Sequence, residues 1–281
     1  MARLNPLHVA VIATIIAGCA ATPRQYDADD SRALNLARAG GIYDTNLRDS
    51  PDGTRSYRKS LLMGVLNLAS LATSLDAPLP HLSGAQTLLF NSADIMMTPE
   101  KPSAKPSLMG WMPASMAENR EAAYERYVTL VDDAISQTAR SMAITATRVT
   151  EGQTQEIDGH PLMLWSVKAE RYGCTGTNCI IACNITTPHF WKTPSYVDGG
   201  EAESYNITAN HPRKYSRLIF QQSGEEITFP MDDFYRRVSA ALPPWIVIYF
   251  PPNRVFQHGE AIPYPVLYEQ GRQLMFKEPA L

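Results

Sequence analysis

The chain has 281 residues, of which 44% are hydrophobic and 19% are charged, and its formal net charge is −3 at pH 7. This composition is typical of a folded protein and excludes a disordered tail, because it supplies enough apolar surface for a core. The evenly mixed charges leave no basic stripe to neutralise phosphates, which argues against nucleic acid as a partner.

A short apolar segment follows the N-terminus. Arg3 supplies a positive charge, and residues 9–17 form an apolar run of about nine residues. A helix needs about 20 apolar residues to cross roughly 30 Å of hydrocarbon, so this run is too short for a permanent membrane anchor. We interpret residues 1–18 as a signal peptide in preference to an anchor helix or a buried core helix.

The end of this segment carries a specific pattern. Ile16-Ala17-Gly18-Cys19 places an aliphatic residue and two small residues directly before a cysteine. The pattern resembles the lipobox of bacterial lipoprotein precursors, and the resemblance covers residues 1–21 only. It implies cleavage before Cys19, a diacylglycerol on the Cys19 sulfur and usually a further acyl chain, such as palmitate, on the new amino group.

The resemblance also implies an address. Ala20 and Ala21 follow the cysteine, and the absence of Asp after Cys19 is similar to the outer-membrane sorting pattern of this family. It implies a protein held by acylated Cys19 to the outer membrane of a Gram-negative cell and facing the periplasm. Several buried acyl chains would make that attachment effectively permanent. We expect residues 19–30, which include three aspartates, to form the lipidated N-terminus and a solvated tether.

Residues 31–147 are expected to be a helical region. Ser31 is predicted to cap a short helix over residues 32–39, which Gly40-Gly41 ends. A second helix is predicted over residues 56–75, because apolar residues recur there at three- and four-residue steps. We expect it to lie in the core. A membrane-surface or partner-docking helix is the alternative, but such helices usually carry a strongly basic face.

A third, longer helix is predicted after a loop marked by Pro99, Pro102 and Pro106. Ser115-Met116-Ala117-Glu118 resembles a capping box, which predicts that this helix begins there and runs to about residue 147. Its apolar side chains fall on one stripe, which is typical of packing against a core.

Residues 148–281 are expected to form a mainly β domain. Asp158-Gly159 predicts a hairpin turn, and the run 245–250 does not alternate, so both of its faces should be covered. One helix is predicted over residues 231–242, between Pro230 and Pro243-Pro244. The predicted strands cover residues 153–157, 162–172, 179–186, 205–209, 216–221, 245–250, 264–268 and 273–276.

The expected fold class is therefore α+β, with a helical N-terminal half followed by a mainly antiparallel β C-terminal half that one helix interrupts.

Three cysteines remain once Cys19 carries lipid, namely Cys174, Cys179 and Cys183. Export places them in an oxidising compartment, where one pair is expected to form a disulfide. Cys174 with Cys179, across the tip of a hairpin, is the most economical pair, and Cys174 with Cys183 is the alternative. Either pair leaves one odd thiol. A metal site is disfavoured, because there is no second cysteine cluster and the nearest histidine is His189.

The sequence contains no convincing catalytic motif. A nucleophile elbow, a Ser-x-x-Lys and helically spaced histidine pairs are all missing, and no glycine-rich phosphate loop is present. Adjacent acid pairs such as Asp132-Asp133 diverge in direction, so they cannot flank one bond. We expect no catalytic residue, no cofactor and no metal. The histidines of the predicted loops are His81, His160, His189, His211 and His258.

The resulting hypothesis is a non-enzymatic, lipid-anchored protein that interacts with other envelope proteins, as a component of secretion, conjugation or surface machinery. One alternative is a periplasmic enzyme acting on cell wall or lipid, whose site is dispersed in the sequence. Another is a lipoprotein that binds a small ligand in a cavity lined by Trp165, Trp191 and Trp245.

Overall fold

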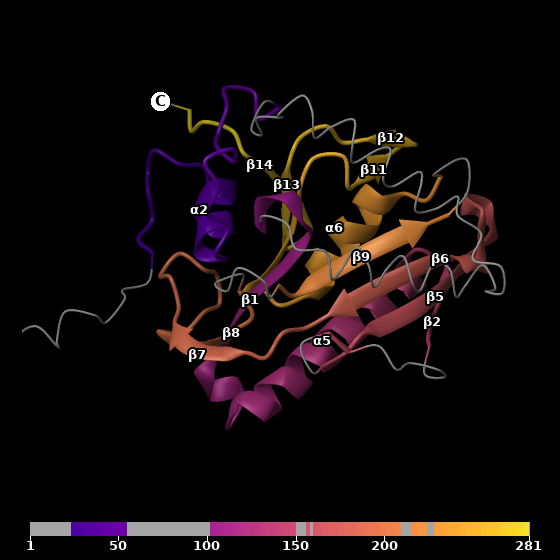
Figure 1. Ribbon diagram of the computed structural model, residues 1–281, viewed down its shortest axis with the longest axis horizontal. Helices are drawn as coiled ribbons and strands as arrows, with labels where there is room; N and C mark the ends of the chain where they lie inside the picture. Colours follow the sequence, from indigo (N-terminus) through magenta and orange to yellow (C-terminus); the bar gives the residue numbers. More distant parts are fainter. Residues whose placement is uncertain are drawn as a thin grey trace, which may run out of the picture.

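A computed structural model of the chain describes residues 24–54, 102–149, 156–157, 160–208, 215–223 and 228–280. Cys19, the predicted signal peptide, the helix predicted over residues 56–75, and both His81 and His211 lie outside these described residues. Within them, every ladder between two strands is antiparallel (Figure 1).

The larger sheet has six strands in the order β14-β13-β10-β1-β8-β7. Its middle strand β1 (Ser107–Pro113) pairs with β10 (Ile246–Phe250) on one side and with β8 (Glu203–Asn206) on the other. The remaining strands are β13 (Val266–Glu269) and β14 (Arg272–Met275) beyond β10, and β7 (His189–Lys192) beyond β8.

A second sheet has four strands in the order β2-β5-β6-β9, and two short hairpins complete the described strands. The two sheets meet where the Leu108 N–H donates to the Ser216 C=O at 2.7 Å. The four-stranded sheet contains β2 (Thr145–Arg148), β5 (Met163–Ala169), β6 (Cys174–Asn184) and β9 (Arg217–Gln222). The hairpins pair β3 (Glu156–Ile157) with β4 (His160–Pro161), and β11 (Phe256–Gln257) with β12 (Glu260–Ala261).

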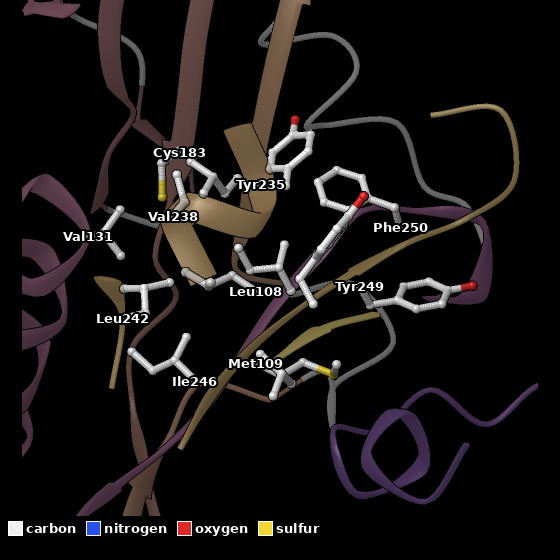
Figure 2. Close-up of a cluster of buried hydrophobic side chains, with 14 of the residues drawn as sticks. Leu108, Met109, Val131, Cys183, Tyr235, Val238, Leu242, Ile246, Tyr249 and Phe250 are labelled. Carbon is white, nitrogen blue, oxygen red and sulfur yellow. The ribbon is translucent and has the colours of Figure 1, made fainter. Parts of the chain in front are cut away.

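Three α-helices of the described residues pack on these sheets. The helices α5 (Arg120–Ser141) and α6 (Met231–Ala241) contact each other, while α2 (Arg32–Ala39) contacts β13 and β14 (Figure 1). One buried cluster takes side chains from both sheets and all three helices, including Val131 of α5 and Val238 of α6 (Figure 2). Short 3-10 turns are η2 (Pro102–Ala104), η3 (Ala114–Met116) and η4 (Glu170–Tyr172).

The helical N-terminal half expected from the sequence is wrong. The described structure is mostly antiparallel β-sheet, and its three helices are spread along the chain. The central strand β1 comes from the region expected to be helical and pairs with β8 and β10 from the region expected to be mainly β. It was missed because β1 is buried at every position, so its sequence does not alternate, and because Gly110 and Pro113 are poor strand formers.

Individual elements match the sequence better than the fold class does. The helix predicted over residues 32–39 is confirmed as α2, and the Ser31 hydroxyl accepts a hydrogen bond from the Leu34 N–H at 3.1 Å. The predicted helix after Pro230 is confirmed as α6. The run 245–250 supplies β10, which is buried at all of its positions, as a strand covered on both faces should be.

The predicted capping box at Ser115 is wrong. Asn119 caps α5 instead, and its side-chain oxygen accepts a hydrogen bond from the Ala122 N–H at 2.9 Å. Ser115 donates from its amide and its hydroxyl to Glu201, in the loop before β8. The helix also ends earlier than expected, because Ala143 adopts a left-handed φ of 49° and the chain then enters β2.

A tyrosine from α5 is built into the ladder between β1 and β8. The Tyr127 hydroxyl accepts a hydrogen bond from the Met112 N–H at 2.9 Å and donates one to the Tyr205 C=O at 2.7 Å. Gly110 makes room for this ring, since a Cβ at that position would lie 2.8 Å from Tyr127 Cε1. Complete burial raises the pKa of the Tyr127 hydroxyl well above its ordinary value, so the group remains a donor at neutral pH.

We predict that Tyr127→Phe lowers the free energy of unfolding by about 1–3 kcal/mol, because the change leaves the buried Met112 N–H and Tyr205 C=O without their shared partner. Urea denaturation of the purified chain measures the loss. Tyr43→Phe is the matched control. The Tyr43 side chain is exposed, so the loss of its hydroxyl should leave the free energy of unfolding unchanged. Equal stability of the two variants would contradict the bridging role.

Candidate interaction surface

The most exposed aromatic side chains of the sheets lie on β7. Phe190 and Trp191 are 48% and 46% exposed, and all four residues of the strand are exposed. β7 is also the last strand of the six-stranded sheet (Figure 1). We call the side of β7 that faces away from β8 the β7 edge. Large exposed aromatic side chains on an edge strand are unusual in a monomer, because such edges attract other strands.

The hydrogen bonding around β8 fixes the direction of the backbone groups of β7. Thr193 N–H donates to the Ala202 C=O, and the Tyr205 C=O is bonded to Tyr127 on the β1 side. Residues of an antiparallel ladder alternate between bonding a partner and pointing away from it. The backbone N–H and C=O groups of Trp191, which lies opposite Ser204, therefore point toward β8. The N–H and C=O groups of Phe190 and Lys192 point outward along the β7 edge.

Two prolines bracket this edge. Pro188 precedes β7 and Pro194 follows it by two residues. Both lie an even number of residues from Phe190 and Lys192, so their backbone groups point outward in the same way. Proline has no N–H and cannot extend a ladder, which restricts the outward donors to those two residues. The β7 edge therefore offers one short stretch for pairing with another strand.

The loop between β7 and β8 is fastened to the start of the described chain. The rings of Tyr26 and Tyr196 contact each other edge to face, with 5.4 Å between their centroids. Arg32 of α2 pairs with Asp198 in this loop and with Glu269 of β13, whose carboxylate is only 1% exposed. The hydrogen bond to Glu269 raises the pKa of the Arg32 guanidinium. These contacts hold the loop against α2.

A hollow of about 760 Å³ lies within the same loop. Its lining includes the charged side chains of Lys192, Glu201 and Glu203. The three tryptophans considered for a ligand cavity are not gathered there, because Trp165 and Trp245 are buried in the core while Trp191 is exposed on β7. The hollow is an open surface feature beside the β7 edge, with charged side chains among its lining residues.

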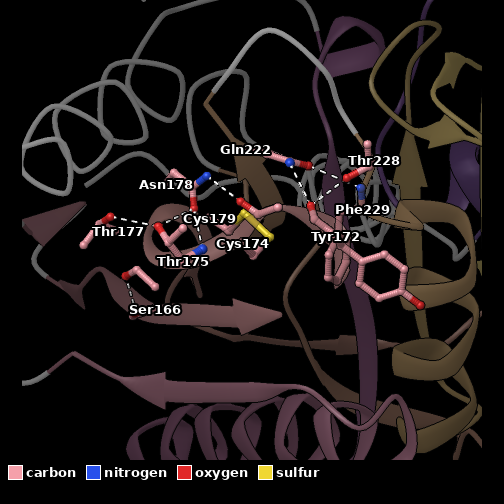
Figure 3. The surroundings of a disulfide bond; sticks show 12 residues. Ser166, Tyr172, Cys174, Thr175, Thr177, Asn178, Cys179, Gln222, Thr228 and Phe229 are labelled. Carbon is pink, nitrogen blue, oxygen red and sulfur yellow. Dashed lines mark hydrogen bonds between the residues drawn. A yellow bond between two sulfur atoms is a disulfide. The ribbon is translucent and has the colours of Figure 1, made fainter. Parts of the chain in front are cut away.

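Cys174 and Cys179 form a disulfide, with their Cα atoms 5.4 Å apart (Figure 3). The hairpin tip expected for this bond is formed instead by η4 and Gly173. The disulfide closes a bulge inside β6. The Asn178 side chain spans this bulge, accepting from the Thr175 N–H at 2.8 Å and donating to the Gly173 C=O at 2.7 Å (Figure 3). The arrangement is a structural clamp on β6.

Cys183 is the odd thiol. It is fully buried in the cluster shared by α5 and α6 (Figure 2). Burial raises the pKa of its thiol far above the ordinary value, so almost no reactive thiolate forms at neutral pH. Cys183 therefore acts as a small apolar core residue.

The described histidines lie on separate elements of the structure. His189 lies on β7, His258 lies in the turn between β11 and β12, and His160 begins β4. Across the described ranges, no group of three or more His, Cys, Asp or Glu side chains is placed to hold a metal ion. Among the same residues, no helix is long and apolar enough to cross a membrane.

No known protein family, curated protein or solved structure matches this chain. The function is therefore inferred from the residues of the chain itself.

We predict that replacing both Cys174 and Cys179 with Ala lowers the free energy of unfolding by about 2 kcal/mol, the loop-closure value for so short a ring. Urea denaturation with and without a reductant measures this effect. The reductant should destabilise the parent by a similar amount and leave the double variant unchanged. A parent that is insensitive to complete reduction would contradict a stabilising disulfide.

Proposed function

We propose that the chain is a lipoprotein that is cleaved before Cys19, acylated on that cysteine and held at the outer membrane facing the periplasm. The observation that carries this proposal is Ile16-Ala17-Gly18-Cys19, which stands at the end of a short apolar run that follows the basic residue Arg3. The folded body acts without catalysis, as an interaction or assembly component of secretion, conjugation or surface machinery in the envelope.

The disulfide supports export. Cysteine pairs persist in oxidising compartments such as the periplasm and are rare in the cytosol. The buried Cys174–Cys179 bond closes a bulge of β6, and Cys183 is a buried free thiol. The disulfide therefore fits a chain that folds outside the cytosol.

The β7 edge supports an interaction role. Aromatic side chains are enriched in protein interfaces, and a strand edge binds an extended segment through main-chain hydrogen bonds. Phe190 and Trp191 supply the aromatic surface, while the outward groups of Phe190 and Lys192 supply the hydrogen bonds.

The proposed anchor would hold this edge near the bilayer. Arg24 follows Cys19 by five residues, a length that reaches at most ~17 Å when fully extended. Two residues later, Tyr26 contacts Tyr196 in the loop between β7 and β8. A lipid on Cys19 therefore keeps the β7–β8 hairpin within a few nanometres of the membrane surface.

We predict that cells given labelled palmitate incorporate the label into the parent chain and not into Cys19→Ser. The variant should also keep its signal peptide, because cleavage by the lipoprotein peptidase follows lipid attachment in this class of protein. Cys183→Ala is the matched control, since it removes a cysteine outside the lipobox and should label like the parent. An unlabelled parent, or equal processing and fractionation of Cys19→Ser, would exclude the lipid anchor.

The interaction role has a separate test. We expect chemical crosslinking of intact cells, followed by detergent extraction, to recover the chain at native abundance in larger complexes, because the β7 edge places hydrogen-bonding groups and aromatic rings at the surface. Recovery of the uncrosslinked monomer alone would count against an assembly component.

A further inference from the structure

The hydrogen-bonding groups of the β7 edge complement those of another β7. An antiparallel strand that approaches the edge meets the N–H and C=O groups of Phe190 and Lys192, which are two residues apart. A second β7 presents the same spacing in the reverse direction. In one register, Phe190 of each copy lies opposite Lys192 of the other. Each of these two residue pairs can then exchange two hydrogen bonds. A two-fold axis passes between the two Trp191 residues.

The flanking prolines agree with this register. It places Pro188 of one copy opposite Pro194 of the other, so the ladder ends at both sides where neither chain has an N–H to donate. A register centred on Phe190 would leave the Lys192 C=O opposite a proline and without a donor. A register centred on Lys192 would set two lysines opposite each other, which is unfavourable.

The side chains of β7 also favour the register that is centred on Trp191. Trp191 would lie opposite its own copy in a non-hydrogen-bonded pair, where Cα atoms are about 4.5 Å apart and aromatic pairs stabilise a sheet. Lys192 would lie opposite Phe190, so its ammonium group faces a ring and no like charge. The two most exposed rings of the sheets are then covered.

From these features we propose that β7 pairs antiparallel with β7 of a second copy of this chain, centred on Trp191, and joins the two six-stranded sheets into one. This names the partner of the β7 edge and rests on its proposed interaction role. A bilayer is the less suitable occupant, because the exposed carboxylates of Glu201 and Glu203 lie in the hollow beside Lys192 of β7 and would be repelled by anionic lipid.

The proposed lipid anchor is compatible with this pairing. A two-fold axis between antiparallel strands of one sheet runs perpendicular to the sheet. If that axis lies along the membrane normal, both copies extend their N-termini to the same height above one bilayer. Confinement to a single membrane also raises the effective concentration of each copy for the other.

Cysteine crosslinking of the full chain in its membrane would test the pairing. Trp191→Cys should give a covalent dimer with a mild oxidant, because the paired Cα atoms lie within disulfide range. His189→Cys is the matched control on the same exposed strand. In this register position 189 lies ~13 Å along the strand from its own copy, beyond that range, and should give no dimer. The native cysteines of the body add no background, since Cys183 is buried and the other two are bonded.

A second variant keeps the test valid if the loss of Trp191 weakens the pairing. Lys192→Pro removes an outward N–H and leaves the inward hydrogen bonds to β8 in place. Light scattering of the detergent-solubilised parent should give the mass of a dimer, Lys192→Pro one half of it, and Lys192→Ala the dimer again. Equal unfolding midpoints would show that the variants are folded.

A monomeric parent, equal crosslinking at positions 189 and 191, or crosslinking of Trp191→Cys only to a different protein would each overturn the pairing. These results are independent of the lipid. A chain that takes up no palmitate but still crosslinks at position 191 would exclude the anchor and support the strand pairing.

Discussion

The two hydrogen bonds of the Tyr127 hydroxyl are the interaction on which the arrangement of the six-stranded sheet depends. It joins the main chains of β1 and β8 from a helix, so a side chain of α5 reinforces the ladder that attaches the outer strands of the six-stranded sheet. β7 pairs only with β8 among the described strands, and its position follows from this bridge. Tyr235 of α6 makes a related contact, since its hydroxyl accepts a hydrogen bond from the Phe220 N–H of β9 at 2.6 Å. Helices and sheets are thus connected by polar groups inside an apolar core.

Buried carboxylates complete this framework. Glu269 accepts hydrogen bonds from Arg32 and Arg272, and Asp232 accepts them from Arg236 and the Tyr268 hydroxyl. A buried charge is costly unless it is paired and hydrogen-bonded, so each of these acids specifies where its partners must lie. Through Arg32, Glu269 links α2 and β13 to the loop that carries β7 toward β8. The exposed edge therefore projects from a rigid support.

The sequence predicts the parts of this fold that local rules control. The cap at Ser31, the proline before α6 and the apolar run of β10 depend on neighbouring residues, and each predicted element is present. The disulfide was likewise the nearest available pair. β1 was missed because its pairing with β8 and β10 is non-local and its buried sequence lacks alternation. The sequence indicates Trp191 only as a residue of a ligand cavity. The outward direction of its neighbours becomes apparent only when the partner strand and the Tyr127 bridge are known.

The prolines that flank β7 explain how the protein can expose an aromatic strand edge without aggregating through it. An open edge of unlimited length would recruit further chains, whereas Pro188 and Pro194 leave room for only one short partner. A pairing of two identical edges is closed by its two-fold axis, because each copy uses the same surface that it offers. Adding a strand of the same kind beyond the pair is then impossible at this edge. The residues that allow the proposed association of two copies would thus also prevent the growth of a longer assembly through β7.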